Sequence, residues 1–279
     1  MSMSDFLAKA EKEFLYGGHL FAFGSAGVIF STSIIGGFNA DAGFLILIYF
    51  IYYLIYLYDH SVGADSDVIT NPIRAEYLKD KIKKEKYIFI LSCFIIGIIL
   101  VLKRSLFIFI ASILTLGLGV LYGRIFKNIT KIIIAFKNFF VAAFWAIIVI
   151  YASLCHGFGV SSAVGLLSLF VFVRMLAVQI FFDIRDVEGD SMKKLRTIPV
   201  VWGKENAVKI IYILNIISIF VLLFAIGIGC WNSGLILLSL SLLYNIYYLK
   251  KYKKGDGTCY LWAAAEPIIW SFLVMLSNI

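Results

Sequence analysis

The chain has 279 residues, of which 62% are hydrophobic and 15% charged, and its formal net charge is +8. A soluble domain carries roughly 45–50% apolar and about 25% charged residues, so this composition excludes an ordinary soluble globule. The apolar residues occur in runs of about 20, the length that an α-helix needs to cross a bilayer. Runs this long and uniform also exclude the short alternating strands of a membrane β-barrel.

Nine apolar runs are predicted as transmembrane helices. We therefore expect an all-α, polytopic membrane protein, with residues 1–279 forming a single domain. In chain order the runs cover 16–35, 42–58, 87–102, 105–122, 132–153, 160–182, 207–229, 232–249 and 258–277. The segment before the first run contains Asp5, Glu11 and Glu13, so it does not resemble the cationic start of a cleaved signal peptide.

The basic residues between the runs predict the orientation. With nine crossings, the N-terminus and the loops after the second, fourth, sixth and eighth runs share one side. Nearly all loop lysines and arginines lie on that side, and Lys103 and Arg104 are the exceptions. Since loops rich in Lys and Arg face the cytoplasm, we expect a multi-pass protein of the cell membrane with this side cytoplasmic. Basic loops also suit anionic lipid head groups, so membrane lipid, and not nucleic acid, is the expected partner.

Two of these cytoplasmic loops are also acidic. If the sixth helix continues beyond its apolar run, Asp183, Asp186 and Asp190 lie at i, i+3 and i+7 on one face. Carboxylates that repel each other favour a cation, and hard oxygen ligands suit Mg²⁺ that is shared with substrate phosphates. The sequence therefore predicts Mg²⁺ as the cofactor. The predicted metal ligands, from both acidic loops, are Asp59, Asp67, Asp183, Asp186 and Asp190.

Several basic residues lie close to these acids along the chain. Lys193, Lys194 and Arg196 follow the second acidic segment directly and are candidates to hold phosphate oxygens. Lys137 and Arg174 lie inside apolar runs, and ionisable groups there usually face the bundle interior. Arg174 lies nine residues before Asp183, so we expect it to reach a polar cavity below the acids. Lys137 is either a second cation of that cavity or a side chain that extends to the membrane interface.

One acidic residue also lies within an apolar run. Glu266 precedes Pro267 in the last run. Its position leaves two roles open, an acid–base group or the partner of a buried cation. The proline is expected to kink this helix, because it removes a backbone hydrogen bond.

The second acidic segment resembles a known motif. It reads Asp183-Ile-Arg-Asp186-Val-Glu-Gly-Asp190, with Thr197-Ile-Pro199 and Gly203 after it. This order resembles the second aspartate motif of the UbiA superfamily of intramembrane prenyltransferases, and the resemblance covers nearly the whole chain, including the nine helices. Arg174 and the Lys137-Asn138 pair also occur where that superfamily often carries similar residues.

The first acidic loop resembles the superfamily's first motif less closely. That motif is Asn-x-x-x-Asp-x-x-x-Asp followed by Pro-x-Arg. Aligning it on Pro72 and Arg74 places Asp67 at the third position, Gly63 at the middle aspartate and Asp59 at the asparagine. Asp65, displaced by two residues, is a possible replacement for the missing carboxylate.

The resemblance implies a Mg²⁺-dependent enzyme that ionises an allylic prenyl diphosphate and transfers the prenyl group to a small aromatic or lipid-precursor acceptor. It implies catalytic roles for four residues, namely Asp183, Asp186, Arg174 and Lys137. Diphosphate binding is expected from five others, namely Asn71, Arg74, Lys193, Lys194 and Arg196. Aromatic faces can stabilise the allylic cation, and the candidates are Phe139, Phe140, Trp145, Phe181 and Phe182.

Three alternatives compete with prenyl transfer. A terpene cyclase on the same scaffold, which needs no acceptor, is consistent with the departure at Gly63. A CDP-alcohol phosphotransferase would require a Gly after the second Asp, and neither acidic loop has that order. A transporter would use the buried charges as an ion path. Product analysis without an acceptor separates the cyclase from the transferase.

Overall fold

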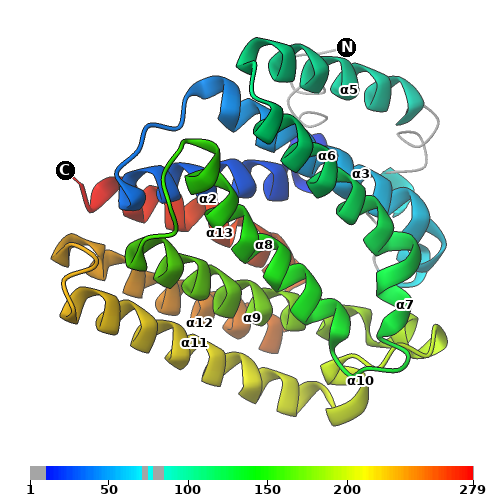
Figure 1. The fold of residues 1–279 in the computed structure, drawn as a ribbon. Coiled ribbons are helices and arrows are strands. Elements are labelled where there is room, and N and C mark those ends of the chain that lie inside the picture. The colour runs from blue at the N-terminus through cyan, green and yellow to red at the C-terminus, as the bar shows by residue number, and fades with distance from the viewer. Residues whose placement is uncertain (1–10, 71–74, 78–84, 279) are drawn as a thin grey trace, which may run out of the picture.

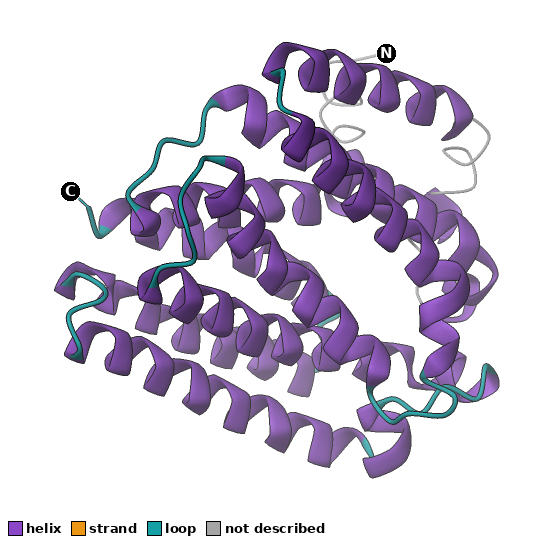
Figure 2. Cartoon of the chain, viewed as in Figure 1, coloured by secondary structure: helices purple, strands orange, loops and turns teal. Residues whose placement is uncertain are grey.

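The computed structural model describes residues 11–70, 75–77 and 85–278; for residues 60, 63–70 and 85 it describes the backbone. Within these ranges the chain is helical and contains no strand (Figures 1 and 2). The longer helices are α2 (His19–Gly36), α3 (Ala42–Thr70), α5 (Glu85–Lys103), α6 (Leu106–Leu121), α8 (Phe136–Cys155), α9 (Ser162–Met192), α11 (Lys204–Gly227), α12 (Leu240–Lys253) and α13 (Cys259–Leu276). The shorter ones are η1 (Tyr122–Phe126), α7 (Lys127–Ile129), α10 (Ile198–Trp202) and η2 (Ser233–Ser239).

Eight helical segments among the described residues are long and apolar enough to cross a membrane. They correspond to eight of the nine predicted runs. In the remaining one, 232–249, the chain forms the 3-10 helix η2 followed by α12, which ends in the basic residues Lys250, Lys251 and Lys253. The all-helical membrane fold is thus confirmed, and the count of nine crossings stays a prediction.

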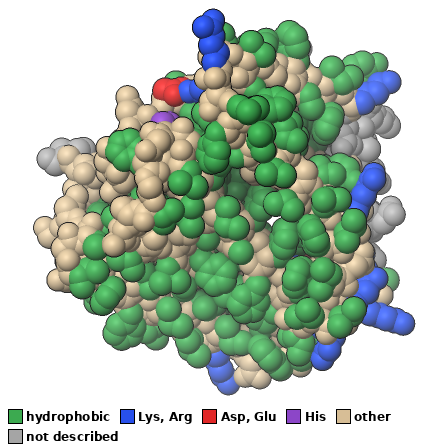
Figure 3. All heavy atoms as spheres, viewed as in Figure 1, with side chains coloured by type: hydrophobic (Ala, Val, Ile, Leu, Met, Phe, Trp, Pro, Cys, Tyr) green, Lys and Arg blue, Asp and Glu red, His purple; other side chains and the backbone are tan. Residues whose placement is uncertain are grey.

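The outer surface of the bundle is apolar. Figure 3 shows hydrophobic side chains over most of one face, with Lys and Arg side chains around its edges. Large apolar residues such as Val101, Leu102 and Leu106, at the turn between α5 and α6, are more than 70% exposed. Such a surface is unfavourable in water and matches the hydrocarbon interior of a bilayer, so these side chains are expected to face lipid.

Helix α9 forms the centre of the bundle and extends beyond the apolar run that predicted it. It begins where the Ser161 side chain accepts a hydrogen bond from the Val164 N–H, and it continues for 31 residues through the acidic segment. The sequence predicted a common face for Asp183, Asp186 and Asp190 on the condition that this helix continues, and the helix does continue through all three residues. Figure 1 shows α8 and α11 on either side of α9.

Helix α3 likewise runs past its apolar run, without a break, from Ala42 to Thr70. It passes through Gly63 and ends at Thr70. Along this helix, residues 59, 63 and 67 stand at i, i+4 and i+8, which places these three positions on one face.

The turn that follows α9 and the turn that precedes α8 are hydrogen-bonded to each other. The Arg196 N–H donates to the Thr130 carbonyl, and the Ala135 N–H donates to the Arg196 carbonyl, both at 2.9 Å. Ala135 and Lys194 adopt left-handed backbone angles, with φ of 59° and 57°, which turn the chain sharply at these points. As a result, the first turn of α8 lies beside the acidic end of α9.

Helix α13 approaches α2 closely because α2 carries glycines at the contact. A Cβ added at Gly24 would lie 3.0 Å from Cβ of Pro267, and one at Gly27 would lie 2.3 Å from Oγ of Ser271. Only residues without a side chain allow this separation. The close contact brings the first turns of α13 over the same interior space that α9 and α3 border.

Candidate active site

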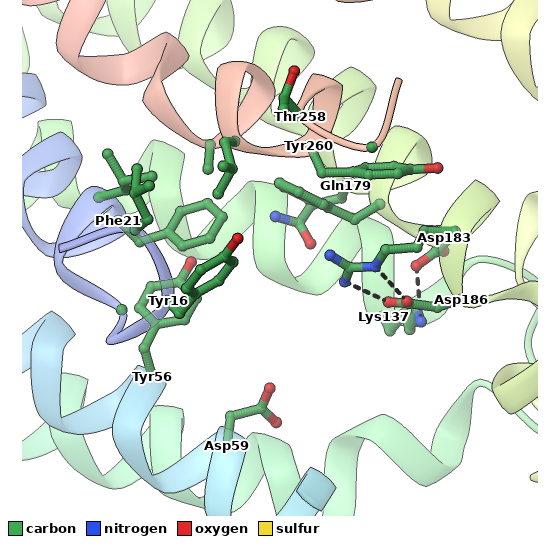
Figure 4. Close-up of a pocket in the computed structure, with 18 of the residues that line it drawn as sticks. Tyr16, Phe21, Tyr56, Asp59, Lys137, Gln179, Asp183, Asp186, Thr258 and Tyr260 are labelled. Atoms are coloured by element: carbon green, nitrogen blue, oxygen red, sulfur yellow. Dashed lines mark hydrogen bonds and ion pairs between the residues drawn. The ribbon is translucent and has the colours of Figure 1, made fainter. Parts of the chain in front are cut away.

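A cavity of about 530 Å³ lies where the ends of these helices meet (Figure 4). Its charged lining residues come from α3, α7, α8 and α9, and the first turn of α13 closes the opposite wall. The charged and polar side chains of the lining are Asp59, Lys127, Lys137, Gln179, Asp183, Arg185, Asp186 and Thr258.

Lys137 connects two carboxylates of α9. Its Nζ lies 2.8 Å from Oδ1 of Asp183 and 2.7 Å from Oδ2 of Asp190. Asn138, the next residue of α8, donates from Nδ2 to the other oxygen of Asp183 at 2.7 Å. All four side chains are buried. The predicted interior position of Lys137 is confirmed, and both oxygens of Asp183 are contacted by α8.

Asp186 is paired with its neighbour Arg185. The Arg185 Nε lies 2.7 Å from Oδ1 of Asp186, and Nη2 lies 3.0 Å from Oδ2. The guanidinium also lies over two rings, 5.5 Å from the centre of Phe182 and 5.2 Å from that of Tyr260. This side of α9 therefore faces α13, whereas the side of Asp183 faces α8.

Asp59 enters the cavity from α3, on a different wall (Figure 4). Its Oδ1 is buried and accepts no hydrogen bond, and the nearest cation is Nζ of Lys127 at 3.7 Å. A buried carboxylate oxygen without a donor is costly, because it has lost its water and gained no partner. Such an atom is suited to receive an additional cation.

Aromatic rings form much of the remaining lining. Phe21, Tyr56, Tyr122, Phe182 and Tyr260 all border the cavity, and Phe21 stacks on Tyr56 with ring centres 4.5 Å apart. A smaller cavity of about 50 Å³ adjoins this wall. It shares Tyr56, Asp59 and Tyr122 with the larger one and is otherwise lined by Tyr52, Ile55, Gly119, Phe140, Val141, Phe144 and Trp145. The charged region thus passes directly into an aromatic one.

The rim of the cavity is formed by the turn before α13, where Gly257 and Thr258 contribute to the lining. Asp256 in this turn accepts hydrogen bonds from Lys251 Nζ at 2.6 Å and from the N–H and Oγ1 of Thr258 at 2.9 and 2.7 Å. The hydrogen bond from Lys251, followed by those from Thr258, lowers the pKa of Asp256 to about 2. The carboxylate therefore stays ionised and holds the turn in place at neutral pH.

Arg174 lies elsewhere. It is fully buried about 14 Å along α9 from Asp183 and does not border the cavity. Its guanidinium donates to Glu266 of α13, to Oδ1 of Asn215 in α11 and to the Ser241 carbonyl of α12. The expectation that Arg174 reaches the polar cavity is wrong, because these partners hold it inside the bundle. Of the two roles left open for Glu266, the structure supports that of partner to a buried cation.

The other predicted cations also lie outside the cavity, or outside the described residues. Lys193, Lys194 and Arg196 are exposed beyond the end of α9, and Arg196 Nη1 donates to the Ile132 carbonyl at 3.0 Å. Asn71 and Arg74 lie outside the described residues, as does the side chain of Asp67.

Only some of the predicted aromatic residues border the cavities. Phe182 lines the larger cavity, and Phe140 and Trp145 line the smaller one. Phe139 is 49% exposed on the outside of the bundle, and Phe181 is buried against Tyr248. The sequence therefore did not distinguish the aromatic residues that line a cavity from those that face outwards or pack in the core.

Sequence reasoning missed several residues of the lining. The most important are Lys127 and Arg185, followed by the aromatic residues Phe21, Tyr56, Tyr122 and Tyr260. Arg185 lies within the second acidic segment, between Asp183 and Asp186, and its position there is the signal that could have identified it. Nothing in the local sequence marks Lys127, because its place depends on the packing of η1 and α7 against α3.

The carboxylates of the cavity fit Mg²⁺ that arrives with a phosphate-bearing substrate. Among the described residues, no three His, Cys, Asp or Glu side chains lie close enough together to enclose a metal. Mg²⁺ is typically held by only one or two carboxylates together with substrate phosphates and water, and does not need a protein cage. Asp59, whose Oδ1 accepts no hydrogen bond, and Asp186, which borders the cavity, provide such ligands. Asp183 and Asp190 already share the ammonium of Lys137.

Two curated relatives match parts of the chain. Both are named digeranylgeranylglyceryl phosphate synthase. The one from Thermococcus sibiricus is 33% identical over 162 residues, which are 56% of this chain and 56% of the relative. The one from Methanosphaera stadtmanae is 40% identical over 53 residues, which are 19% of this chain and 20% of the relative. The matches thus span about half, or less, of the length of these relatives.

Solved structures and a family model extend over more of the chain. An apo structure of a UbiA homolog from Aeropyrum pernix K1 superposes with a TM-score of 0.71 at 13% identity, over 92% of this chain and 98% of that one. A structure described for digeranylgeranylglyceryl phosphate synthase in membranes gives 0.56 at 16% identity, over 96% and 97%. These likenesses establish the fold. The model of the UbiA prenyltransferase family matches residues 64–272, and the chain belongs to this family.

Proposed function

We propose that this chain is an intramembrane prenyltransferase that binds a prenyl diphosphate with Mg²⁺ in the central cavity and transfers the prenyl group to a lipid acceptor. The observation that carries the proposal is the composition of this one cavity. Charged side chains occupy part of its wall, and aromatic rings continue from them into a bundle whose helices are long enough to span a membrane. An isoprenoid diphosphate has the same division between charge and hydrocarbon.

Two lysines of the cavity would bind and neutralise the diphosphate. Lys127 and Lys137 border the cavity, each beside a carboxylate. Fixed charges of this kind stabilise the negative charge that develops on the leaving group in the transition state. When bound, Mg²⁺ would supply Lewis-acid neutralisation of the same charge, and Asp59 and Asp186 are the residues that would hold it. Asp67 remains a predicted ligand.

The aromatic wall would stabilise the allylic cation that ionisation produces. Phe21, Tyr56 and Phe182 present rings to the cavity beside the charged residues, and a cation over an aromatic face is stabilised electrostatically. Water in the site would quench this cation, so the enclosing helices also serve to exclude solvent. The smaller aromatic cavity behind Tyr56 suits the first carbons of the prenyl tail.

For the acceptor, we extend to this chain the product for which both curated relatives are named. The donor would be geranylgeranyl diphosphate and the acceptor geranylgeranylglyceryl phosphate. Of the acceptor types that the sequence left open, this is the lipid precursor and not the aromatic compound. A terpene cyclase gains no support from the described residues or from these relatives, and we do not propose it.

The cavity would open to the cytoplasm. Its charged and polar lining residues lie towards the ends of α8, α9 and α13 that adjoin the basic loops. Under the positive-inside rule this end of the bundle faces the cytoplasm. The diphosphate would then enter from the cytoplasm while its tail stays among the helices.

A reconstituted assay tests the proposal. The purified full chain is incubated with Mg²⁺ and geranylgeranyl diphosphate, with and without geranylgeranylglyceryl phosphate, and diphosphate release and lipid products are measured. We expect the doubly prenylated lipid, with Asp186→Ala inactive. Asp41→Asn is the matched control, because Asp41 pairs with Lys103 at the other end of α3. Product formation in excess chelator would contradict the Mg²⁺ requirement, and a cyclic hydrocarbon without acceptor would contradict transfer.

A further inference from the structure

The cations of the cavity lie on two different sides of α9. Residues 183 and 185 are separated by about 200° around a helix, so their side chains point in nearly opposite directions. Asp183 points to α8, where Lys137 lies 2.8 Å away. Arg185 points to α13, where its guanidinium lies 5.2 Å from the centre of the Tyr260 ring. The side of α9 that faces α8 therefore presents the ammonium of Lys137 to the cavity, and the side that faces α13 presents a guanidinium.

Transfer between two phosphorylated lipids needs such a separation. Under the function proposed above, on which this inference rests, the donor carries a diphosphate and the acceptor carries a phosphate that takes no part in the reaction. Two anions in one cavity repel each other, the more strongly where water is excluded. A separate cation for each anion reduces this repulsion and also fixes which end of the acceptor enters the cavity.

The setting of Arg185 suits the acceptor's phosphate. A guanidinium is a planar fork that matches phosphate oxygens with two parallel hydrogen bonds, and it keeps its charge at every relevant pH. In this structure, Asp186 holds the fork through Nε and Nη2, and the rings of Phe182 and Tyr260 lie beside it. Its side chain is 18% exposed and borders the cavity close to the rim residues Gly257 and Thr258.

We propose that Arg185 binds the phosphate of the acceptor lipid and so determines that the acceptor is a phosphate-bearing alcohol. In the step itself, the acceptor's hydroxyl oxygen forms a bond to the allylic carbon while the bond between that carbon and the diphosphate oxygen breaks. The diphosphate leaves with the electron pair and takes up the hydroxyl proton. The acceptor's own phosphate is unchanged and serves only as the group by which Arg185 holds it.

Binding measurements test this assignment without relying on turnover. Wild type, Arg185→Gln and Arg185→Lys are purified as full chains in detergent, and ligand affinities are obtained from thermal protection. The ligands are geranylgeranyl diphosphate with Mg²⁺, geranylgeranylglyceryl phosphate, and the same glyceryl lipid without its phosphate. Arg124→Gln is the matched control, since Arg124 is an exposed arginine outside the cavity, beside the ring of Tyr58.

For Arg185→Gln we expect the apparent Kd for the glyceryl phosphate lipid to rise at least about tenfold, the scale of a lost charge-assisted hydrogen bond. The Kd for the diphosphate should change much less. The preference for the phosphorylated lipid over its phosphate-free form should largely disappear. Arg185→Lys should lie between the two, because an ammonium keeps the charge but not the fork. Arg124→Gln should match wild type.

Two results would overturn the assignment. In one, Arg185→Gln binds the glyceryl phosphate lipid as wild type does. In the other, it loses affinity for both ligands equally, which would mean that Arg185 acts only through Asp186. Failure of the proposed function has a different signature, because wild type would then release no diphosphate with any acceptor. The binding comparison still reports on Arg185 in that case.

Discussion

Lys137 and Asp183 form an ion pair that crosses from α8 to α9, and the same ammonium contacts Asp190, about two helical turns further on. The pair depends on the hydrogen bonds between the turn before α8 and the turn after α9, because they place the first residues of α8 at the acidic end of α9. A single lysine thereby offsets part of the repulsion between two buried carboxylates.

Removing this lysine should affect stability and turnover together. Lys137→Gln leaves Asp183 and Asp190 buried without their cation, and breaking a buried pair costs about 3–5 kcal/mol. We expect a large loss of thermal stability in detergent and no diphosphate release. The double variant Lys137→Gln/Asp190→Asn removes one of the stranded charges, so its stability should recover in part while turnover stays absent. Wild-type turnover in the double variant would show that Lys137 is only structural.

The unbroken course of α3 predicts unequal roles for its acidic residues. Asp59, Gly63 and Asp67 occupy one helical face, whereas position 65 lies well away from it. Asp67→Ala should therefore lower Mg²⁺-dependent diphosphate release strongly, and Asp65→Ala should change it little. The measurement is the Mg²⁺ dependence of release for each variant. Equal losses in the two would show that the helix unwinds at Gly63 in the working enzyme.

A carboxylate moved by one turn of the same helix should partly replace Asp59. Asp59→Asn alone removes the negative charge of this carboxylate, and we expect it to weaken Mg²⁺-dependent release severely. Adding Gly63→Asp restores a carboxylate four residues along, so the double variant should regain part of the Mg²⁺ response. The single variant Gly63→Asp is the control for effects of the added side chain. No recovery in the double variant would restrict metal binding to the position of Asp59.

The Arg174–Glu266 pair is expected to hold the bundle without contacting substrate. Either single substitution, Arg174→Met or Glu266→Met, leaves a charge buried in the membrane and should cost about 3–5 kcal/mol. Replacing both by methionine removes both charges, which is often neutral or stabilising. We therefore expect the double variant to recover its melting temperature and most of its activity. A stable but inactive double variant would instead support the catalytic role that the resemblance implied for Arg174.

Membrane orientation can be checked with introduced cysteines. Ser191 is exposed next to Asp190 at the cavity end of α9, and Gly159 is exposed at the opposite end, between α8 and α9. In intact cells of a cysteine-free variant, Ser191→Cys should resist a membrane-impermeant thiol reagent, and Gly159→Cys should react. Both should react after the membrane is opened. The reverse pattern in intact cells would place the cavity on the outer side.

The sequence predicted the features that depend on regular spacing within one segment of the chain. Apolar runs of the right length identified the membrane helices, and the spacing of Asp183 and Asp190 identified their common face. It did not predict partners that come from distant helices. Lys127 pairs with Asp59 only because η1 and α7 bend back towards α3, and Arg174 was assigned to the cavity because the sequence does not show that Glu266 and Asn215 surround it.

The burial of Arg174 has a consequence for how the protein is made. Its carboxylate partner, Glu266, lies 92 residues later in the chain, and Asn215 lies 41 residues later. When α9 leaves the ribosome, the arginine therefore has neither partner, and an unpaired guanidinium in the hydrocarbon region is costly. We therefore expect α9 to pack stably in the bundle only after α13 has been synthesised. Chains that stop before residue 266 would keep this arginine without its carboxylate and should be less stable.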